Sequence, residues 1–203
     1  MQSNQLISEH FAHNLYFDRT FGLEAAKVLP GEYFVATANV VLVTVLGSCV
    51  SACIRDHTNG IGGMNHFMLA DSGRDDDLFS ASARYGTFAM EILINHLLKL
   101  GAKRQNLEAK LFGGGRVMAS LSSSMVGDRN VQFARKYLKT EGIALVSSDL
   151  LDIHPRKVYF FPATGRVLVK KLIRIHNDTL ERREKTYAAR LHEEPVSGEI
   201  ELF

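Results

Sequence analysis

The sequence has only two cysteines among its 203 residues, Cys49 and Cys53, and they stand four positions apart. A disulfide between them would close too small a loop to constrain the unfolded chain much, so a reducing compartment is the expected environment. The chain also lacks any long block of basic residues, and its formal net charge is only +2. This charge pattern gives nucleic-acid binding no support, and we expect no nucleic-acid partner.

A secretory leader and a membrane-spanning helix are also not expected. Glu9 and His10 interrupt the N-terminus before an apolar run can form, unlike in a signal peptide. The 21 residues of 34–54 carry no charge and are long enough to span a bilayer as a helix. However, β-branched residues dominate this stretch and Gly47-Ser48 interrupts it, which favours two buried strands. We therefore expect a cytoplasmic protein without membrane insertion.

The composition favours one globular domain with an addition at each end. Hydrophobic residues make up 46% of the chain, which is enough for a sizeable core. Residues 1–30 mix aromatic and charged side chains and end at Pro30-Gly31, which predicts an N-terminal extension that packs on the domain. Residues 176–203 carry four Arg or Lys against seven Asp or Glu, which predicts a charged C-terminal tail. The domain itself is expected over 31–175.

Hydrophobic periodicity predicts alternating strands and helices over this domain. Apolar spacing near 3.6 residues predicts helices over 82–101 and 128–142, each closed by a glycine. Short runs rich in β-branched and aromatic residues predict strands, several of them joined as hairpins, over 31–37, 40–46, 50–56, 62–69, 109–115, 143–149, 157–161 and 166–173. Since strands outnumber helices, the predicted fold class is α/β: a single domain with central mixed β-sheets flanked by helices.

The segment "LGSCVSACIRDHTNGIGGMNHFML" offers a nucleophile and a base. A nucleophilic cysteine needs a base, a donor for the developing oxyanion and a position that a substrate carbonyl can reach. The "GSC" turn after a strand can supply the last two for Cys49, because Gly47 permits a tight or unusual backbone geometry. His66 lies in the next predicted strand, so a hairpin can bring its imidazole to the thiol.

The register of this hairpin leaves the nucleophile open between the two cysteines. A two-residue turn at Asn59-Gly60 would pair positions that sum to 119 and set Cys53 opposite His66. A longer loop would instead set Cys49 opposite His66. The pair can also be read as small buried side chains and a core histidine. A zinc site is disfavoured, because C-x3-C spacing without a second cysteine pair makes a poor ligand set.

Two further motifs are interpreted as structural. The glycine run in 112–116 lacks the spacing and the Lys-Ser/Thr of a phosphate-binding loop, so we expect a turn that needs positive φ. His154, Arg156 and Lys157 form a basic group that is interpreted as the solvated start of a strand.

Several motifs together carry a resemblance to a known family. They are "LGSCVSACIRD", "GGMNHFMLADSG", "RYGTFAMEILINHLLKLGA", "AKLFGGGRVM", "GDRNVQFARKYLKTEGI" and "DIHPRKVYFFPATGRVLVKKL". In order and without large gaps, from Leu29 to Leu172, they closely resemble the CheD-type chemoreceptor glutamine deamidases. The resemblance implies a deamidase domain over 31–175, a cytoplasmic hydrolase, and a fold similar to that of deamidating bacterial toxins. It also implies that glutamines of methyl-accepting chemotaxis receptors become glutamates.

Matched motif to motif, the resemblance places the family's cysteine nucleophile on Cys49 and its histidine on His66. The family's third active-site residue is a threonine six positions before the cysteine, where this chain has Val43. Thr44 is the nearby substitute, but adjacent strand residues point to opposite faces, so its role depends on a bulge that realigns it. The resemblance implies a thioester mechanism without metal or organic cofactor. It also implies that "DHTNG" does not close as the two-residue hairpin that opposes Cys53 to His66.

The expected partners follow from the same resemblance. They are the cytoplasmic helices of methyl-accepting chemotaxis receptors and, as in some bacteria, a CheC-type phosphatase. Two alternatives to deamidation stay open: a regulatory binding module for such a phosphatase or receptor, and a hydrolase of receptor methyl esters that uses the same thiol chemistry.

Overall fold

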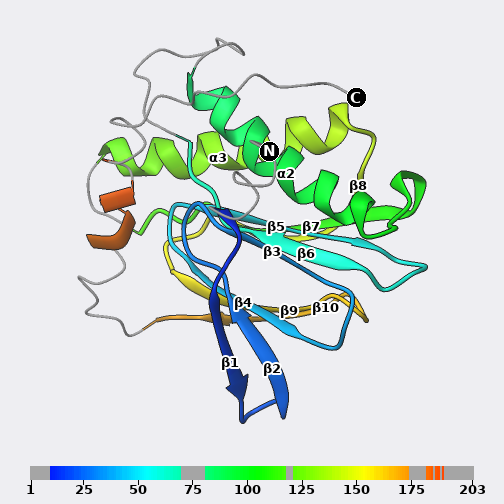
Figure 1. The fold of residues 1–203 in the computed structure, drawn as a ribbon. Coiled ribbons are helices and arrows are strands. Elements are labelled where there is room, and N and C mark those ends of the chain that lie inside the picture. Colours follow the sequence, from blue (N-terminus) through cyan, green and yellow to red (C-terminus); the bar gives the residue numbers. More distant parts are fainter. Residues whose placement is uncertain are drawn as a thin grey trace.

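Two stacked β-sheets and a layer of helices make up the molecule (Figure 1). The structure, a computed structural model, describes residues 10–69, 81–117, 121–173, 182–184, 186, 187 and 189. The first sheet has strand order β3-β6-β5-β7-β8, and the second has β1-β2-β4-β9-β10. Each sheet is mixed, because it contains one parallel pair among antiparallel ones. The α/β fold predicted from the sequence, with central mixed sheets and flanking helices, is confirmed.

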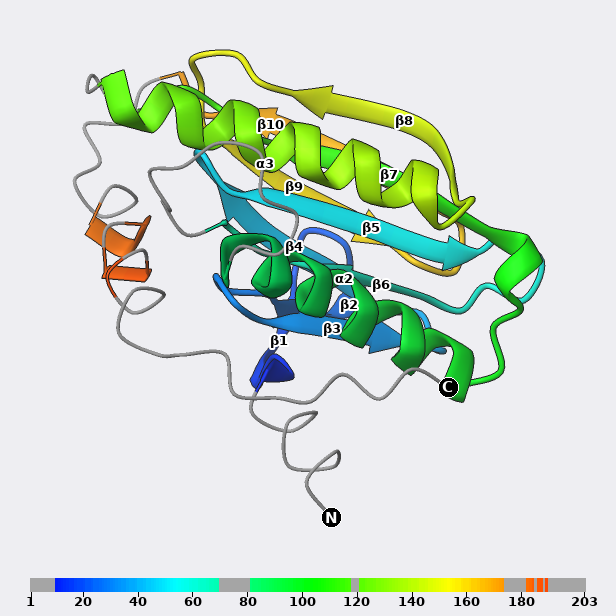
Figure 2. The same cartoon turned by 90° about the horizontal axis from the view of Figure 1, so that it is seen from above.

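The first sheet carries the helices on one face (Figure 2). Its strands are β3 (Tyr33–Ala36), β5 (Val50–Asp56), β6 (Gly62–Asn65), β7 (Leu107–Gly113) and β8 (Ala144–Leu150). The helices are α2 (Ala81–Lys99) and α3 (Leu121–Thr140), and a short 3-10 helix, η1 (Arg104–Asn106), precedes β7. The predicted helix over 128–142 thus begins seven residues earlier than expected, at Leu121. Its first turns include three serines and Gly127, which weaken the helical pattern.

The second sheet includes two strands from the segment predicted as an extension. Its strands are β1 (Asn14–Asp18), β2 (Leu23–Lys27), β4 (Val41–Leu46), β9 (Arg156–Phe161) and β10 (Arg166–Lys171). Strand β1 pairs with β2, and β2 runs parallel to β4. The sequence "LEAAK" of β2 has no β-branched residue, so its strand conformation comes from the sheet that it joins and not from its own propensity.

The two faces of β5 serve two hydrophobic cores. Val50, Ala52 and Ile54 pack in the core between the first sheet and the helices. Cys49 and Cys53 pack in the core between the two sheets. This division follows from the alternation of side chains along a strand. Both cysteines therefore face the second sheet, and both are free and buried.

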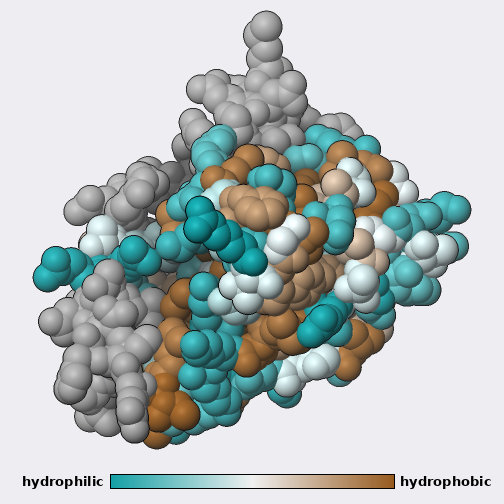
Figure 3. All heavy atoms as spheres, turned by 90° about the horizontal axis from the view of Figure 1, so that it is seen from below, coloured by the Kyte–Doolittle hydropathy of each residue, from teal (hydrophilic) through white to brown (hydrophobic). Residues whose placement is uncertain are grey.

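The outer face of the second sheet is shielded by its own side chains. Ala25, Val41 and Val43 are buried there beneath partly buried residues that include Tyr16, Phe21, Leu23, Tyr159 and Phe161. Phe21 meets both Tyr159 and Phe161 edge to face, with ring centroids 5.2 Å apart in each pair. Figure 3 shows the molecule from below, with hydrophobic and hydrophilic residues interspersed over this face.

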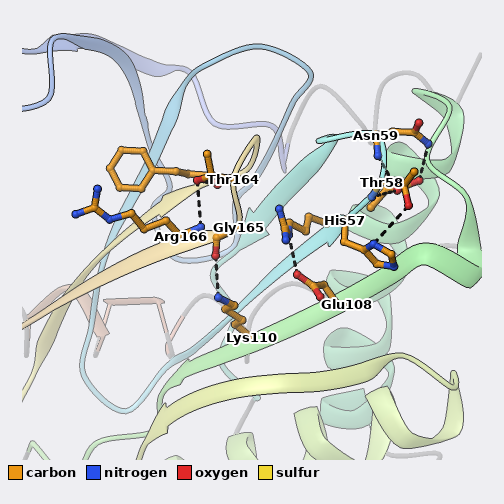
Figure 4. Close-up of polar contacts among 11 residues, drawn as sticks. His57, Thr58, Asn59, Glu108, Lys110, Thr164, Gly165 and Arg166 are labelled. Atoms are coloured by element: carbon orange, nitrogen blue, oxygen red, sulfur yellow. Dashed lines mark hydrogen bonds and ion pairs between the residues drawn. The ribbon is translucent and has the colours of Figure 1, made fainter.

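The end of β5 remote from Cys49 is tied to the second sheet by polar contacts (Figure 4). Lys110 Nζ on β7 donates to the carbonyl of Gly165, in the turn between β9 and β10, at 2.8 Å. Beside it, Arg55 and Glu108 form an ion pair at 2.7 Å between β5 and β7. The bond of Lys110 joins the two sheets away from the thiol, and the ion pair ties β5 to β7 within the first sheet.

The uncharged stretch 34–54 runs through the end of β3, all of β4 and the start of β5, with a break at Gly47-Ser48. The prediction of strands for this stretch is confirmed. In the part of the chain that the structure describes, no helix is long and apolar enough to cross a membrane.

Arg156 corrects the interpretation of the basic group as a solvated strand start. Its side chain is fully buried at the beginning of β9. It pairs with the Asp149 carboxylate at 2.8 Å and also donates to the carbonyl of Leu151. These acceptors match the donors of both terminal nitrogens, whereas the buried Nε has no hydrogen-bond partner among the described residues. Arg156 therefore holds the turn after β8 and is not solvated.

Candidate active site

Cys49 lies in the turn between β4 and β5, which a glycine turn from β7 holds in place. The N–H groups of Gly114 and Gly115 donate to the carbonyls of Cys49 and Gly47, both at 2.7 Å. Gly113 and Gly114 have positive φ, +109° and +68°, as predicted for this glycine run. A Cβ on Gly113 would lie 2.1 Å from the Cys49 carbonyl oxygen. The run is therefore a support for the backbone of Cys49.

The hairpin register differs from both of the registers considered from the sequence. Cys53 pairs with Met64, and Val50 forms a bridge with Phe67, so positions that sum to 117 face each other. The residue opposite His66 is therefore Ser51. The prediction that the turn does not set Cys53 directly against His66 is confirmed. Cys49 and Cys53 are instead the two diagonal neighbours of His66 on one face of the hairpin.

Other contacts of the hairpin and of its turn explain this register. Asp56 accepts hydrogen bonds from the backbone N–H groups of Thr58 and Asn59, at 2.8 and 3.0 Å, and the N–H of Asp56 donates to Ile61. The turn therefore spans more than Asn59 and Gly60. At the other end, the backbone of His66 bonds outside the hairpin, to Glu32 and Gly31.

Thr44 lies on the inward face of β4 and contacts His66 directly. Its hydroxyl oxygen is 2.8 Å from Nδ1 of His66 and 2.7 Å from the carbonyl oxygen of Val28. The pairing of β4 with β9 continues without a bulge from Leu42 to Leu46. Since Val43 packs on the opposite, outer face, Thr44 needs no realignment to reach the histidine.

These two contacts fix which nitrogen of His66 carries the proton. The Val28 carbonyl can only accept, so the Thr44 hydroxyl donates its single hydrogen there. The Thr44 oxygen then accepts from Nδ1–H of His66, which leaves Nε2 as the basic nitrogen. Among the described residues, this buried Nε2 has no hydrogen-bond partner. Burial lowers the pKa of His66 to about 4, so the imidazole is neutral at pH 7 and can accept a proton.

Glu184 brings a carboxylate onto the turn that carries Cys49. Its Oε1 accepts the backbone N–H groups of Gly47 and Ser48 at 3.0 Å each, and that of Cys49 at 3.5 Å. Its Oε2 accepts the Ser48 hydroxyl at 2.7 Å. The three successive N–H groups thus form an anion-binding turn next to the thiol.

The two cysteines differ in their electrostatic surroundings. Burial raises the pKa of Cys49, and the charge of Glu184 and a hydrogen bond with it raise that pKa further. Burial also raises the pKa of Cys53, but its polar neighbours are Ser51 and Lys110. Only Cys49 therefore combines a thiol, a turn of N–H donors and the hairpin face of His66.

A small cavity adjoins these groups. It has a volume of about 20 Å³ and is lined by both His66 and Glu184, together with Val28, Leu29 and Val45. This is room for one water molecule beside the imidazole.

Comparison with known proteins assigns the family. The model of the family described as CheD chemotactic sensory transduction matches residues 68–171. A protein of Janthinobacterium sp. (strain Marseille) is 62% identical over 201 residues, which cover 98% of this chain and 99% of that protein. The chain belongs to the CheD family. The Janthinobacterium relative is named "Probable chemoreceptor glutamine deamidase CheD".

Two further matches differ greatly in their closeness to this CheD-family chain. A protein of Dechloromonas aromatica (strain RCB), named "Probable chemoreceptor glutamine deamidase CheD 1", is 66% identical over 195 residues, 96% of each chain. A solved Neisseria meningitidis protein of the DUF152 family is 13% identical, covers 64% of each chain and superposes with a TM-score of 0.40.

Sequence reasoning proposed Cys49, His66 and Thr44 as site residues of this CheD-family chain, but it did not propose two further residues that bind the turn at Cys49. Asn130 on α3 is fully buried, and its Nδ2 donates to the carbonyl of Ser48 at 2.9 Å. Its place on the apolar stripe of α3, one turn before Ala134, is a signal that the sequence does contain. Glu184 lies in the charged tail and gives no comparable local signal.

Within the described ranges, no group of three or more His, Cys, Asp or Glu side chains is placed to bind a metal ion.

Proposed function

We propose that this CheD-family chain hydrolyses the side-chain amide of selected chemoreceptor glutamines to glutamate, with Cys49 as nucleophile and His66 as base. Family membership and the names of the relatives support the reaction and its substrate. The observation that carries the assignment of residues is the hydrogen bond of Thr44 to Nδ1 of His66, which leaves Nε2 basic on the hairpin face that also bears Cys49. Thr44 is the proposed positioning residue.

The first half of the proposed reaction forms a thioester. Nε2 of His66 takes the proton of the Cys49 thiol, and the thiolate attacks the carboxamide carbon of a bound glutamine. Negative charge develops on the amide oxygen, where the N–H groups of Gly47, Ser48 and Cys49 can receive it. Each such donor is worth about 10²- to 10³-fold in rate in well-studied enzymes. The C–N bond then breaks, and ammonia leaves with the proton that His66 carried.

The second half releases glutamate. The neutral imidazole takes a proton from a water molecule, whose oxygen attacks the thioester carbon. The small cavity beside His66 and Glu184 offers space for this water. The C–S bond breaks, the thiol is reprotonated, and the net reaction consumes one water and releases one ammonia for each glutamine.

The proposal also covers the substrate region, the cellular compartment, the domain bounds and a second partner. The substrate is the cytoplasmic helical region of methyl-accepting receptors, so the chain acts in the cytoplasm, where its two free cysteines stay reduced. The proposed deamidase domain covers 31–175, with strands β1 and β2 of the N-terminal segment completing its second sheet and 176–203 as a tail. A CheC-type phosphatase is a second proposed partner.

The test is incubation of the chain with the cytoplasmic fragment of one receptor, followed by peptide mass spectrometry of each glutamine. Cys49→Ala is expected to abolish the conversion, and His66→Ala to reduce it nearly as far, because the two act as a unit. Cys53→Ala serves as the matched control and should retain activity. Activity in Cys49→Ala with loss in Cys53→Ala would overturn the assignment. Loss of receptor methyl esters with every glutamine intact would favour the methyl-ester hydrolase.

A further inference from the structure

A segment near the C-terminus is fixed to the candidate site at two points. Residues 182–184 and the pair 186–187 are helical, so Glu184 and Tyr187 lie one helical turn apart. Glu184 binds the turn at Cys49, as described above, and it is only 2% exposed. The Tyr187 hydroxyl hydrogen bonds with the hydroxyl of Tyr85 on α2. We name the described part of 182–187 the Glu184 segment.

Both contacts of the Glu184 segment are close-packed. A Cβ on Gly47 would come within 2.5 Å of Oε1 of Glu184, so a side chain at position 47 would push the carboxylate from this place. A Cβ on Gly31 would come within 2.9 Å of the Tyr187 ring. Figures 1 and 2 show this segment, in orange, beside the sheets at the end where β5 begins.

Hydrogen bonds to both oxygens compensate for the burial of the Glu184 carboxylate. An ionised carboxylate in a protein interior is costly unless donors satisfy its oxygens. Here the donors are backbone N–H groups and the Ser48 hydroxyl, and these charge-assisted bonds are the stronger kind. The same N–H groups are the ones that the proposed reaction needs for its oxyanion.

The chemistry of Glu184 matches the product of that reaction. Deamidation of glutamine leaves a glutamate side chain with its carboxylate next to the thiol and to the N–H groups of the turn. Glu184 is a glutamate on a helical turn with its carboxylate in that place. We infer that the Glu184 segment occupies the receptor-binding surface of its own chain as an intramolecular product mimic, and thereby inhibits the enzyme. This inference rests on the proposed function.

The inhibition acts at two levels. The bound carboxylate accepts the hydrogen bonds of the N–H groups that would otherwise bind the amide oxygen of a glutamine. Its negative charge next to the sulfur also opposes formation of the thiolate, as the raised pKa of Cys49 indicates. A receptor helix must displace the segment, so the apparent KM of the chain is the intrinsic KM divided by the fraction of molecules in which the segment is released.

The first test removes the carboxylate. Glu184→Ala is expected to lower KM for a receptor fragment by about 5- to 100-fold, the range typical of coupling between sites, with little change in kcat. It should also speed alkylation of Cys49 by iodoacetamide, while Cys53 stays as slow as before. Glu141→Ala, which removes a surface glutamate that pairs with Arg104, is the matched control and should behave as wild type.

Tyr187→Ala is the second variant. It loosens the other anchor without touching the thiol, so it should shift KM and alkylation in the same direction, whether or not Glu184→Ala folds well. A synthetic peptide of residues 180–190, added to Glu184→Ala, should restore inhibition competitively with the receptor fragment. The same peptide with alanine for the glutamate should not.

The results separate this inference from the proposed function. Unchanged KM and alkylation in both variants of an active chain would overturn the inference. A large fall in kcat of Glu184→Ala would also overturn it, because Glu184 would then belong to the catalytic machinery. Faster alkylation of Cys49 in chains that never deamidate a receptor would count against the proposed function and support the covering of the thiol by this segment.

The product-like position has its own measurement. Glu184→Gln puts a carboxamide on the same N–H groups, so residue 184 should be converted to Glu in the purified chain, and should remain Gln when Cys49→Ala is added. Glu141→Gln is the control and should remain Gln in both backgrounds. A chain that deamidates a receptor but leaves Gln at 184 would show that the carboxylate does not stand in the place of the product.

Discussion

Thr44 lies in β4 of the second sheet and His66 directly follows β6 of the first, and a hydrogen bond of 2.8 Å joins their side chains across the core. The Thr44 hydroxyl also donates to the carbonyl of Val28 at 2.7 Å, so its hydrogen is committed. The histidine can therefore present only one tautomer to Cys49, the one with a basic Nε2. This relationship makes Thr44 a residue that acts through His66.

Thr44→Val is expected to lower kcat for deamidation by about 10- to 1,000-fold, part of what a positioned base contributes, while KM changes little. Valine keeps the shape of threonine but cannot accept from Nδ1–H, so the imidazole loses its fixed tautomer. Thr44→Ser restores the hydroxyl and should recover most of kcat. Steady-state kinetics on a receptor fragment measures both constants. A Thr44→Val chain with wild-type kcat would show that His66 is oriented by other contacts.

Gly113→Ala should cost much more than Gly101→Ala, although both glycines have positive φ, +109° and +97°. A Cβ at Gly101 meets nothing within 4 Å, so that change costs only the backbone strain of about 1–2 kcal/mol. A Cβ at Gly113 would lie 2.1 Å from the carbonyl oxygen of Cys49 and must push that backbone away. Urea unfolding measures the free energies, and a deamidation assay should show loss only for Gly113→Ala. Equal losses of stability and activity in the two variants would show that the glycine turn does not support the backbone of Cys49.

Asp56 gives a pH-dependent contribution to stability. Burial alone would raise its pKa, but hydrogen bonds from Lys103, Asn59 and Thr58 outweigh this and hold the pKa well below its usual range. Because the folded pKa lies below the unfolded value of about 3.9, the stabilisation is full above that value and is lost as the pH falls through the folded pKa. Asp56→Asn should therefore lower the free energy of unfolding by about 2–3 kcal/mol at pH 7, with a shrinking difference below about pH 4. Urea unfolding at several pH values measures this. A difference that grows on acidification would contradict it.

The sequence predicted those parts of the fold that depend on local pattern. The amphipathic stretch that became α2 and the β-branched run that became β4 were both expected, because their apolar spacing is unambiguous. Strands β1 and β2 were not expected, since β2 has no β-branched or aromatic residue and is a strand through its pairing with β4, and β1, despite Tyr16 and Phe17, pairs with β2. The family resemblance, and not the pattern, favoured Cys49 over Cys53.

Long-range relationships within the site were beyond the sequence. Whether Thr44 or Val43 faces the histidine depends on which face of β4 packs against the first sheet, and the charge-free run 34–54 does not reveal that face. Glu184 is separated by more than a hundred residues from the turn that it binds, so no local spacing connects them. Asn130 was within reach, as a polar residue on an apolar helical stripe.

The Thr44 hydroxyl donates its hydrogen to the carbonyl of Val28, the residue directly after β2. The hairpin of β5 and β6, with Cys49 and His66 at its ends, therefore does not contain every residue that orients the imidazole. If the hairpin were grafted onto another scaffold, its thiol and imidazole would still lie on one face, but no contact would fix the tautomer of the imidazole. The strand pair next to it would have to be transplanted as well.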